Sequence, residues 1–495
     1  MFDQIRILFI IVLCGVVGFF IIKKVYKNQL SVTVFNHWLV TWIGIITVAC
    51  LAGNYWLFAI CVGLIGIYSV NYLKEDAIFL YLFLLPALPM LGNDLPGFAG
   101  IRIIMEFTYP RLLSLSILLP LFIRYKYKIL PFNQGRVNRY FIWMMVYFFV
   151  IGSVRTDSGT DLLRSLVYIF LDSILPYFMV SRLVDSFERL NKAFIAIASS
   201  AIILSIVNII EYFKYWFVYQ EIYQSLNISS HSFSAYAMIR DGMVRSASVF
   251  SSPIVLGFFI LVAFGASLGG REKKGFIGKV VLVLLLLALI TSLSRGPWVG
   301  FMFLIFTIAW YSAKRGANFL KGLFFGGVGG IVLLLSPVGN KIINLLPFVG
   351  SVDSGNVGYR ADLFSSSLEV IGNNLLFGTQ NFLAAPELQH LMQGQGIIDI
   401  VNTYLQIALE FGLVGLLLFL AFFLSHLRGL YLLLRNKKYL NNIEDRRAAA
   451  ALLGIGISIM VTIATVSKIN YIPIYYLITL SLMAGVISFT RKPKT

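Results

Sequence analysis

Apolar runs long enough to cross a bilayer recur along the whole chain, and this feature constrains the fold more than any other. A membrane-spanning helix needs roughly 20 apolar residues, and such runs extend from Ile7–Ile22 to Ile472–Phe489 with mostly short gaps between them. By this criterion we count about fourteen spans. Because backbone groups in hydrocarbon must bond internally and the runs are continuous rather than alternating, helices are favoured over a barrel. The sequence therefore predicts an all-α polytopic integral membrane protein.

The composition agrees with lipid as the solvent of this chain. Of its 495 residues, 59% are hydrophobic and 13% are charged. The mean hydropathy of +0.85 lies outside the range of soluble domains. The two halves of the chain show no internal repeat and no matching pair of interrupted helices, which disfavours a transporter. We expect residues 1–495 to form a single membrane domain.

The formal net charge of +18 would suggest nucleic acid in a soluble protein, so the positions of the positive residues decide its meaning. They gather in short segments between apolar runs, where positive residues mark the cytoplasmic side and contact anionic lipid. Membrane lipids are therefore an expected partner, and nucleic acid is not. The clusters are Arg124, Lys126, Lys128, Arg136 and Arg139; Arg271, Lys273, Lys274 and Lys279; and Arg428, Arg435, Lys437, Lys438, Arg446 and Arg447.

Stepping through the spans from these clusters assigns four segments to the outer face: 92–109, 154–161, 214–244 and 338–400. Segment 338–400 is the largest and is net acidic, as expected of a translocated loop. Within it, Ala361–Val370 has helical spacing, whereas the Gly-rich stretch Gln393–Gly396 is typical of a turn. We therefore expect a large, partly helical outer loop.

Arg295 is a candidate for chemistry because it lies where a positive residue is disfavoured. It stands in Ser294–Trp298, at an outer-face turn between two spans. A guanidinium offers five donors in a rigid fork, which suits the oxygens of a diphosphate. The structural alternative is a helix-end arginine that reaches lipid headgroups. Arg360, at the start of the predicted loop helix, is equally open to a functional role or to an ion pair with Asp362.

Other outer cations add to this pattern. Arg245 stands at the outer end of another span, and Arg102 and Arg111 flank a further outer segment. Convergence of several outer cations is hard to explain by topology alone. Asp172 lies within a span, where an ionisable residue indicates a functional site. Arg164, two helical turns earlier, is its expected partner. A neutral Asp172 that holds two helices together is the alternative.

The remaining candidates carry weaker signals. The aromatic-rich segment Glu211–Tyr223 is better explained as an interfacial belt than as a platform for sugars. His231 and His390 are expected on the outer face without metal-ligand spacing, so each is only a loose candidate for a base. No phosphate-cradling Gly-rich loop is present, and neither a metal nor a nucleotide cofactor is expected. The cysteines all lie inside apolar runs: Cys14, Cys50 and Cys61.

Three stretches resemble, in the same order, the O-antigen ligase and polysaccharide polymerase superfamily. Each combines an outward topology with a motif that is weak alone, and their order makes the match more specific. Together they span roughly residues 240–425. The stretches are Arg245–Pro253; Ser294–Trp298; and a third that runs from Arg360 through Leu375–Gly378 and Asn402–Leu405 to Glu410–Gly415.

The resemblance implies a multi-pass enzyme of the bacterial inner membrane, with an active site that faces the periplasm and with 338–400 as a large periplasmic loop. An undecaprenyl-diphosphate-linked glycan would be the donor, and an acceptor sugar hydroxyl would attack its anomeric carbon. Arg295 and Arg360 would hold the diphosphate. The expected substrate-binding residues are Arg245, Arg102, Arg111, Asn402 and Tyr404.

One position departs from the family pattern. Ligases of this superfamily usually place a histidine immediately before the asparagine that Asn402 matches, and this chain has Val401 there. Valine cannot accept a proton, so three other residues are candidates for the base: Asp399, Glu410 and His390. The departure favours a polymerase over a ligase, because the polymerase branch is looser at this position.

We therefore predict a polysaccharide polymerase that transfers a growing O-antigen or exopolysaccharide chain onto the next lipid-linked repeat unit. An O-antigen ligase, which moves finished glycan to a lipid or protein acceptor, is the second hypothesis. A lipid-linked oligosaccharide flippase or other transporter, and a scaffolding subunit of an export complex, are rivals from other classes. Chain-length regulators and flippases would be the partner proteins of such an enzyme.

Overall fold

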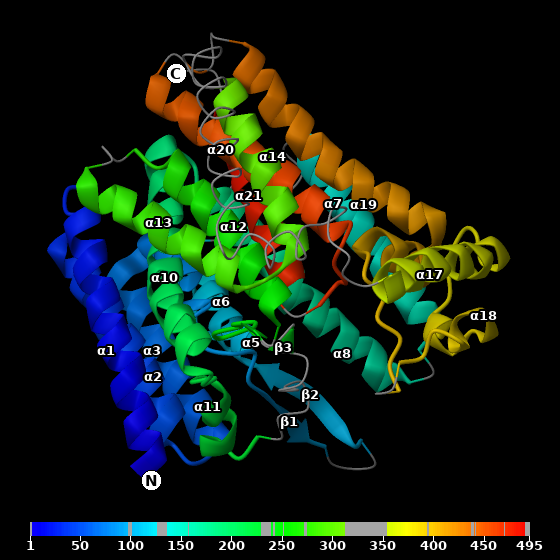
Figure 1. Ribbon diagram of the computed structural model, residues 1–495, viewed down its shortest axis with the longest axis horizontal. Coiled ribbons are helices and arrows are strands. Elements are labelled where there is room, and N and C mark those ends of the chain that lie inside the picture. Colours follow the sequence, from blue (N-terminus) through cyan, green and yellow to red (C-terminus); the bar gives the residue numbers. More distant parts are fainter. Residues whose placement is uncertain are drawn as a thin grey trace.

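The computed structural model describes residues 2–97, 101–125, 136–156, 158–228, 239–240, 243–250, 252–271, 275–311, 354–393, 396–436, 440, 442–469 and 471–490. These residues form a helical bundle, with a pair of helices set to one side and a β-hairpin at one end (Figure 1). The longer helices are α1 (Phe2–Val25), α2 (Val32–Leu51), α3 (Tyr55–Leu73), α7 (Arg136–Val154), α8 (Gly159–Ile169), α10 (Phe187–Lys214), α12 (Pro253–Gly269), α13 (Phe276–Thr291), α14 (Arg295–Tyr311), α17 (Ser354–Asn373), α19 (Thr403–Arg435), α20 (Ile443–Ile463) and α21 (Ile472–Thr490).

The shorter elements connect these helices or interrupt them. Two are single π-helical turns within longer helices, η2 (Ser114–Leu118) and η3 (Phe170–Ile174). The others are η1 (Lys74–Asp76), α4 (Ala77–Leu84), β1 (Gly92–Pro96), β2 (Ile103–Thr108), α5 (Tyr109–Leu113), α6 (Leu119–Tyr125), α9 (Leu175–Leu183), α11 (Gln220–Ser225), β3 (Ile239–Arg240), β4 (Met243–Val244), η5 (Phe382–Ala384) and α18 (Pro386–Gln389).

Within the described residues, eight helices are long and apolar enough to cross a membrane: Asp3–Val25, Val32–Leu51, Tyr55–Leu84, Gly159–Leu183, Phe187–Lys214, Thr403–Arg435, Ile443–Ile463 and Ile472–Thr490. Three shorter apolar helices accompany them: Asn138–Val154, Pro253–Gly269 and Phe276–Thr291. The predicted all-α polytopic membrane fold is confirmed. The predicted number of about fourteen spans stays a prediction.

Burial separates central helices from those that face lipid. In α10 and α21, 83% of the most apolar window is buried inside the protein, whereas the corresponding share in α1 is 39%. An exposed apolar face on a membrane helix is expected where lipid covers it, because lipid tails are as apolar as the side chains. Helices α10 and α21 therefore form the centre of the bundle.

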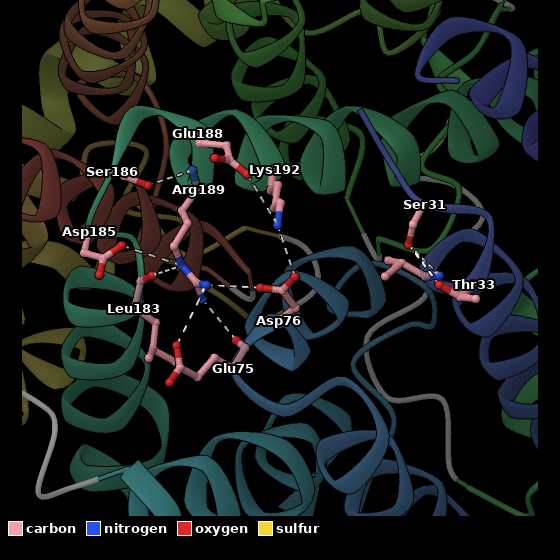
Figure 2. Close-up of polar contacts among 11 residues, drawn as sticks. Ser31, Thr33, Glu75, Asp76, Leu183, Asp185, Ser186, Glu188, Arg189 and Lys192 are labelled. Atoms are coloured by element: carbon pink, nitrogen blue, oxygen red, sulfur yellow. Dashed lines mark hydrogen bonds and ion pairs between the residues drawn. The ribbon is translucent and has the colours of Figure 1, made fainter. Parts of the chain in front are cut away.

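Ion pairs join the ends of helices where the sequence predicts the cytoplasmic side. Arg189 and Lys192 of α10 both contact Asp76 in the turn before α4, at 3.1 and 3.2 Å (Figure 2). Arg271, after α12, pairs with Asp445 of α20 at 2.8 Å. These contacts gather basic segments from distant parts of the chain at one end of the bundle.

The segments that we assign to the outer face meet at the opposite end. Strands β1 and β2 form an antiparallel hairpin, with Gly92 paired to Thr108. Tyr168 of α8 fixes this hairpin, because its hydroxyl accepts a hydrogen bond from the amide of Glu106 at 2.7 Å. The side chain of Asn227 donates to the carbonyl of Gly53 at 2.8 Å. Segment 92–109, which we assign to the outer face, thus forms a hairpin, and the β-branched residues of β2, Ile103, Ile104 and Thr108, suit the extended pairing.

Helices α17 and α18 form a small unit beside the bundle (Figure 1). Ala361–Val370, predicted to be helical, lies within α17, which begins at Ser354 rather than at Arg360. Gly396 has a φ of +71°, and its amide donates to the carbonyl of Gln393 at 2.8 Å, as expected of a turn. A separate apolar core ties this unit to the start of α19, made by Leu363, Val370, Ile371, Phe382, Leu388, Leu391, Ile400, Leu405, Ala408 and Leu409.

Candidate functional site

Arg295 is the first residue of α14, in the turn that follows α13. Its side chain is half-buried, and the two serines of the turn, Ser292 and Ser294, are buried. Leu293 has a φ of +45°, a conformation that L residues rarely adopt and that is enriched near functional sites. Gly296 lies so close to Thr465 that a Cβ would collide with the Thr465 hydroxyl. The structure thus fixes Arg295 beside the turn between α20 and α21.

The segment after Arg245 packs against the same region. The amide of Ser246 donates to the carbonyl of Thr291 at 3.3 Å, so this segment lies next to the end of α13. Ser248 has a φ of +52°, and its amide donates to Oε2 of the fully buried Glu211 at 2.8 Å. The first two stretches of the family resemblance are therefore neighbours, each with a strained residue near its arginine.

The turn between α20 and α21, residues 464–471, connects to the start of α19 through four contacts. Thr403 Oγ1 donates to the carbonyl of Val466 at 2.6 Å, and Oε1 of Gln406 accepts from the amide of Lys468 at 2.8 Å. Ser467 Oγ donates to Oδ1 of Asp399 at 2.7 Å. Nζ of Lys468 lies 2.8 Å from Oε2 of Glu410. Two of the three candidate bases, Asp399 and Glu410, thus contact this turn.

Two motif stretches of the resemblance form a joint that bends α19. Gly412, inside α19, has a φ of +68°, and a Cβ there would collide with the carbonyl of Leu376. Gly378 has a φ of +73° and lies against Leu409, Glu410 and Gly412. Leu413 donates its amide to the carbonyl of Leu375 at 2.9 Å. Leu375–Gly378 and Glu410–Gly415 are thus explained by close backbone packing.

Side chains from α7 and the turn after it satisfy the carbonyls exposed at this joint. Arg155 donates from Nη1 to the carbonyl of Glu410 at 2.6 Å and from Nη2 to those of Phe377 and Gly378, each at 2.8 Å. The hydroxyl of Tyr147 donates to the carbonyl of Phe411 at 2.8 Å. Sequence reasoning missed Arg155, although it lies in the outer segment 154–161 and its charge there was the available signal.

Arg360 and His390 are exposed on the small unit of α17 and α18. Among the described residues, Arg360 forms no ion pair with Asp362, which was its structural alternative. Its neighbour Tyr359 reaches Asp399, whose amide and carbonyl both lie 3.1 Å from the Tyr359 hydroxyl. Arg360 therefore stands one residue from a contact to the Asp399 segment. His390 caps the end of α18, and His231 lies outside the described residues.

Asn402 and Tyr404 have structural contacts. Oδ1 of Asn402 caps α19 by accepting from the amides of Tyr404 and Leu405, at 2.9 and 3.2 Å. The hydroxyl of Tyr404 donates to the carbonyl of Met460 at 2.9 Å. These contacts supply a structural reason for both residues, and their role in binding substrate stays a prediction.

Asp172 pairs with Arg111 and not with Arg164, the partner named from the sequence. Nη2 of Arg111 lies 2.9 Å from Oδ2 of Asp172, and Nε donates to both carboxylate oxygens at 3.1 Å. Arg164 instead pairs with Asp161 and donates to the carbonyls of Ile103 and Ile104. Arg164 was the wrong prediction, because it rested only on closeness to Asp172 along the chain. In the structure the π-helical turn at Phe170–Ile174 lies beside α5, which brings Arg111 to Asp172. The pair joins η3 to α5, so Asp172 does connect two helical segments, as the structural alternative expected.

A cavity of about 440 Å³ contains this ion pair. Its polar walls are Glu106, Thr108, Arg111, Asp172, Ser173 and Tyr223, and its apolar walls are Met90, Pro110, Pro473, Ile474 and Leu477. Burial raises the pKa of Tyr223 to about 12, so this phenol is neutral at physiological pH. Arg102 is exposed on the loop between β1 and β2 and is not among the residues that line the cavity.

The structure thus brings several candidates together in two groups near the start of α21. One group surrounds the turn 464–471 and includes Arg295, Asp399, Glu410 and Lys468. The other group is the cavity around Arg111 and Asp172. Sequence reasoning missed Lys468, which lies in a short turn between apolar runs and matches none of the quoted motifs.

A family model for O-antigen ligase matches residues 280–420 of this chain, which include Arg295, Arg360, Asp399 and Glu410. The resemblance to the O-antigen ligase and polymerase superfamily is confirmed over this region. The match supports a membrane enzyme of the glycosyltransferase type. A search among curated proteins found no match.

Proposed function

We propose, on the premise that residues 280–420 match the O-antigen ligase family, that this chain is a polysaccharide polymerase. It transfers a growing glycan from undecaprenyl diphosphate onto the next lipid-linked repeat unit. The convergence of Arg295, the Arg245 segment and Lys468 at one end of the bundle carries the proposal. That end is the periplasmic face of a bacterial inner membrane, since the basic segments gather at the other.

The chemistry needs cations near the leaving group. The acceptor hydroxyl oxygen forms a bond to the anomeric carbon, and the bond from that carbon to the diphosphate oxygen breaks. The diphosphate leaves with the bonding electron pair, so its negative charge grows during the step. Arg295 and Arg360 stabilise this charge through charge-assisted hydrogen bonds, and removal of one such donor typically costs on the order of 100-fold in rate.

The proton of the acceptor hydroxyl goes to a carboxylate, and Asp399 is the residue best suited to take it. Asp399 is exposed, and its Oδ1 is held by the Ser467 hydroxyl, which fixes the orientation of the group. Glu410, by contrast, is engaged by the ammonium of Lys468. His390 is exposed at the end of α18, whereas Asp399 contacts the turn 464–471 through Ser467. Asp399 therefore takes the role of the family histidine, whose position is occupied by Val401 in this chain.

A ligase is the second candidate, because the matching family model is described as O-antigen ligase and suits either enzyme. The two functions differ in the acceptor: a polymerase uses another lipid-linked repeat unit, whereas a ligase uses a different lipid or a protein. Chain-length regulators and flippases are the proposed protein partners of either enzyme.

The size distribution of undecaprenyl-linked saccharides, extracted from the native host with and without this gene, tests the proposal. Single repeat units that accumulate on deletion would identify a polymerase. Long lipid-linked chains without a transferred product would identify a ligase instead. An unchanged distribution would reject both.

A further inference from the structure

The cavity beside α21 differs in its chemistry from the nearby turn 464–471, beside which Arg295 and Lys468 lie. All three guanidinium nitrogens of Arg111 already donate: Nε and Nη2 to Asp172, and Nη1 to the carbonyl of Glu106 at 2.8 Å and its Oε2 at 3.3 Å. The guanidinium also lies 3.5 Å above the ring of Tyr168. The Arg111 side chain is only 10% exposed. Arg111 is therefore committed to the protein and poorly placed to grip a phosphate.

The charged groups that remain open to a ligand are acceptors. The side chains of Asp172 and Glu106 are 30% and 47% exposed, three to five times as much as that of Arg111. Two carboxylates against one guanidinium leave the cavity with net negative charge. A phosphate would meet repulsion here, and it would have to break a buried ion pair to reach Arg111.

A hydroxyl-rich neutral molecule suits the same walls. Carboxylates accept charge-assisted hydrogen bonds from hydroxyl groups. The hydroxyls of Thr108 and Ser173 add donors and acceptors, and Pro473, Ile474 and the Tyr223 ring offer apolar surface for the C–H faces of a sugar. The volume of about 440 Å³ lies within the usual range for small-ligand sites.

The cavity also lies close to the proposed reaction centre. Pro473 and Ile474 of its wall are the second and third residues of α21, which follows the turn 464–471, and that turn carries Lys468. Tyr471 is the last residue of this turn, and its hydroxyl donates to the carbonyl of Leu88 at 3.0 Å. Leu88 is two residues before Met90, which belongs to the cavity wall. The start of α21 therefore lines the cavity and continues directly from the turn beside which Arg295 lies.

We infer that this cavity binds the sugar at the non-reducing end of the acceptor, and that it selects for neutral saccharide and against phosphate. The inference rests on the proposed transfer function, because it assigns the second substrate of that reaction. The acceptor hydroxyl lies at the glycan end remote from its own lipid diphosphate, which fits a site of negative charge. Asp172 and Glu106 are its binding groups, and Arg111 is a positioning residue that orients Asp172.

Binding by the purified full chain in lipid nanodiscs tests the inference without turnover. The probe is the phosphate-free repeat-unit oligosaccharide, released from the host's lipid-linked pool by mild acid, and calorimetry measures its affinity. Glu106→Gln is expected to weaken binding about tenfold, since a neutral acceptor replaces a charged one. Ser173→Ala is expected to weaken it less. Asp94→Asn removes a carboxylate at the position opposite Glu106 in the hairpin register. Asp94 is not among the residues that line the cavity, so this variant is expected to bind as the wild type does.

Two further probes separate the acceptor end from the donor end. An oligosaccharide methylated on its non-reducing-end sugar is expected to bind weakly, whereas one blocked at the reducing end is expected to bind normally. Inorganic pyrophosphate is expected not to displace either. No binding by the wild type, equal binding by Glu106→Gln, displacement by pyrophosphate, or the reverse pattern with the blocked oligosaccharides would each overturn the inference.

A comparison with Arg295→Ala distinguishes this inference from the proposed function. Arg295→Ala is expected to keep saccharide binding within about twofold of wild type and to lose polymer formation. Binding that depends on Glu106, together with normal polymer from Arg295→Ala, would leave the saccharide site standing and reject the diphosphate role. Loss of polymer from Arg295→Ala without any effect of Glu106→Gln on binding would support the diphosphate role and reject the saccharide site.

Discussion

The backbone of Gly378 lies directly against the backbone of Gly412, and this joint sets the position at which Glu410 meets Lys468. Both glycines have positive φ, +73° and +68°, and both are too close to neighbouring backbone to carry a Cβ. Gly378 and Gly412, which belong to stretches that carry the family resemblance, therefore have a structural role. They bend α19 so that its first turns approach the turn 464–471.

The joint predicts that Gly412→Ala destabilises the protein strongly. A positive φ alone costs an L residue roughly 1–3 kcal/mol, and the collision with the carbonyl of Leu376 adds to it. Gly396→Ala is the matched control, because Gly396 also has a positive φ, +71°, but no atom lies within 4 Å of its added Cβ. Thermal unfolding in detergent should show a much larger fall in Tm for Gly412→Ala. Equal falls would contradict the packing account.

Glu211 is predicted to hold the Arg245 segment in place. Glu211→Ala would leave the buried amide of Ser248 without its acceptor, which costs about 1–3 kcal/mol. Glu211→Gln keeps an acceptor oxygen and should lose less. Both Tm and transfer activity should follow the order wild type, Gln, Ala. Full activity and stability in Glu211→Ala would show that the segment needs no such support.

The proposed base predicts a difference between two outer residues. Asp399→Asn should lower the transfer rate by about 100-fold or more, the usual contribution of a general base, whereas His390→Gln should have little effect. The rates are compared with purified protein and lipid-linked repeat units. A large loss from His390→Gln with a normal Asp399→Asn enzyme would reverse the assignment.

The proposed sidedness predicts opposite labelling of two exposed positions. Asp94 lies on the hairpin and Asp185 at the end of the bundle that carries the basic segments. In a chain whose native cysteines are replaced by serine, Asp94→Cys should react with a membrane-impermeant maleimide in intact spheroplasts. Asp185→Cys should react only after the membrane is opened. The opposite pattern would invert the topology.

Much of the architecture followed from the apolar runs, because a helix in lipid is specified by length and composition. The turn at Arg295 and the helix at Ala361–Val370 were also predicted, because each depends on the local sequence pattern. The partner of Asp172 was not, since Arg111 is distant in sequence and only packing of the π-helical turn against α5 brings the two together.

The site was predictable only where charge conflicted with topology. Arg295, Arg245 and Arg111 stood out because positive residues are disfavoured on the outer side. Lys468 and Arg155 carried the same signal, but no recognised motif surrounds them. The cavity around Arg111 could not be predicted from the sequence, because its walls come from the hairpin, α5, η3, α11 and α21.

The most direct test of the diphosphate role of Arg295 uses the host deleted for this gene and complemented with Arg295→Ala, Arg295→Lys or Arg435→Ala. Arg435, exposed at the far end of α19, is the matched arginine control. The measurement is the size distribution of undecaprenyl-linked saccharides at equal protein level. Arg295→Ala should accumulate single repeat units, Arg295→Lys should rescue poorly because lysine lacks the planar fork, and Arg435→Ala should restore long chains. Long chains from Arg295→Ala would contradict the account.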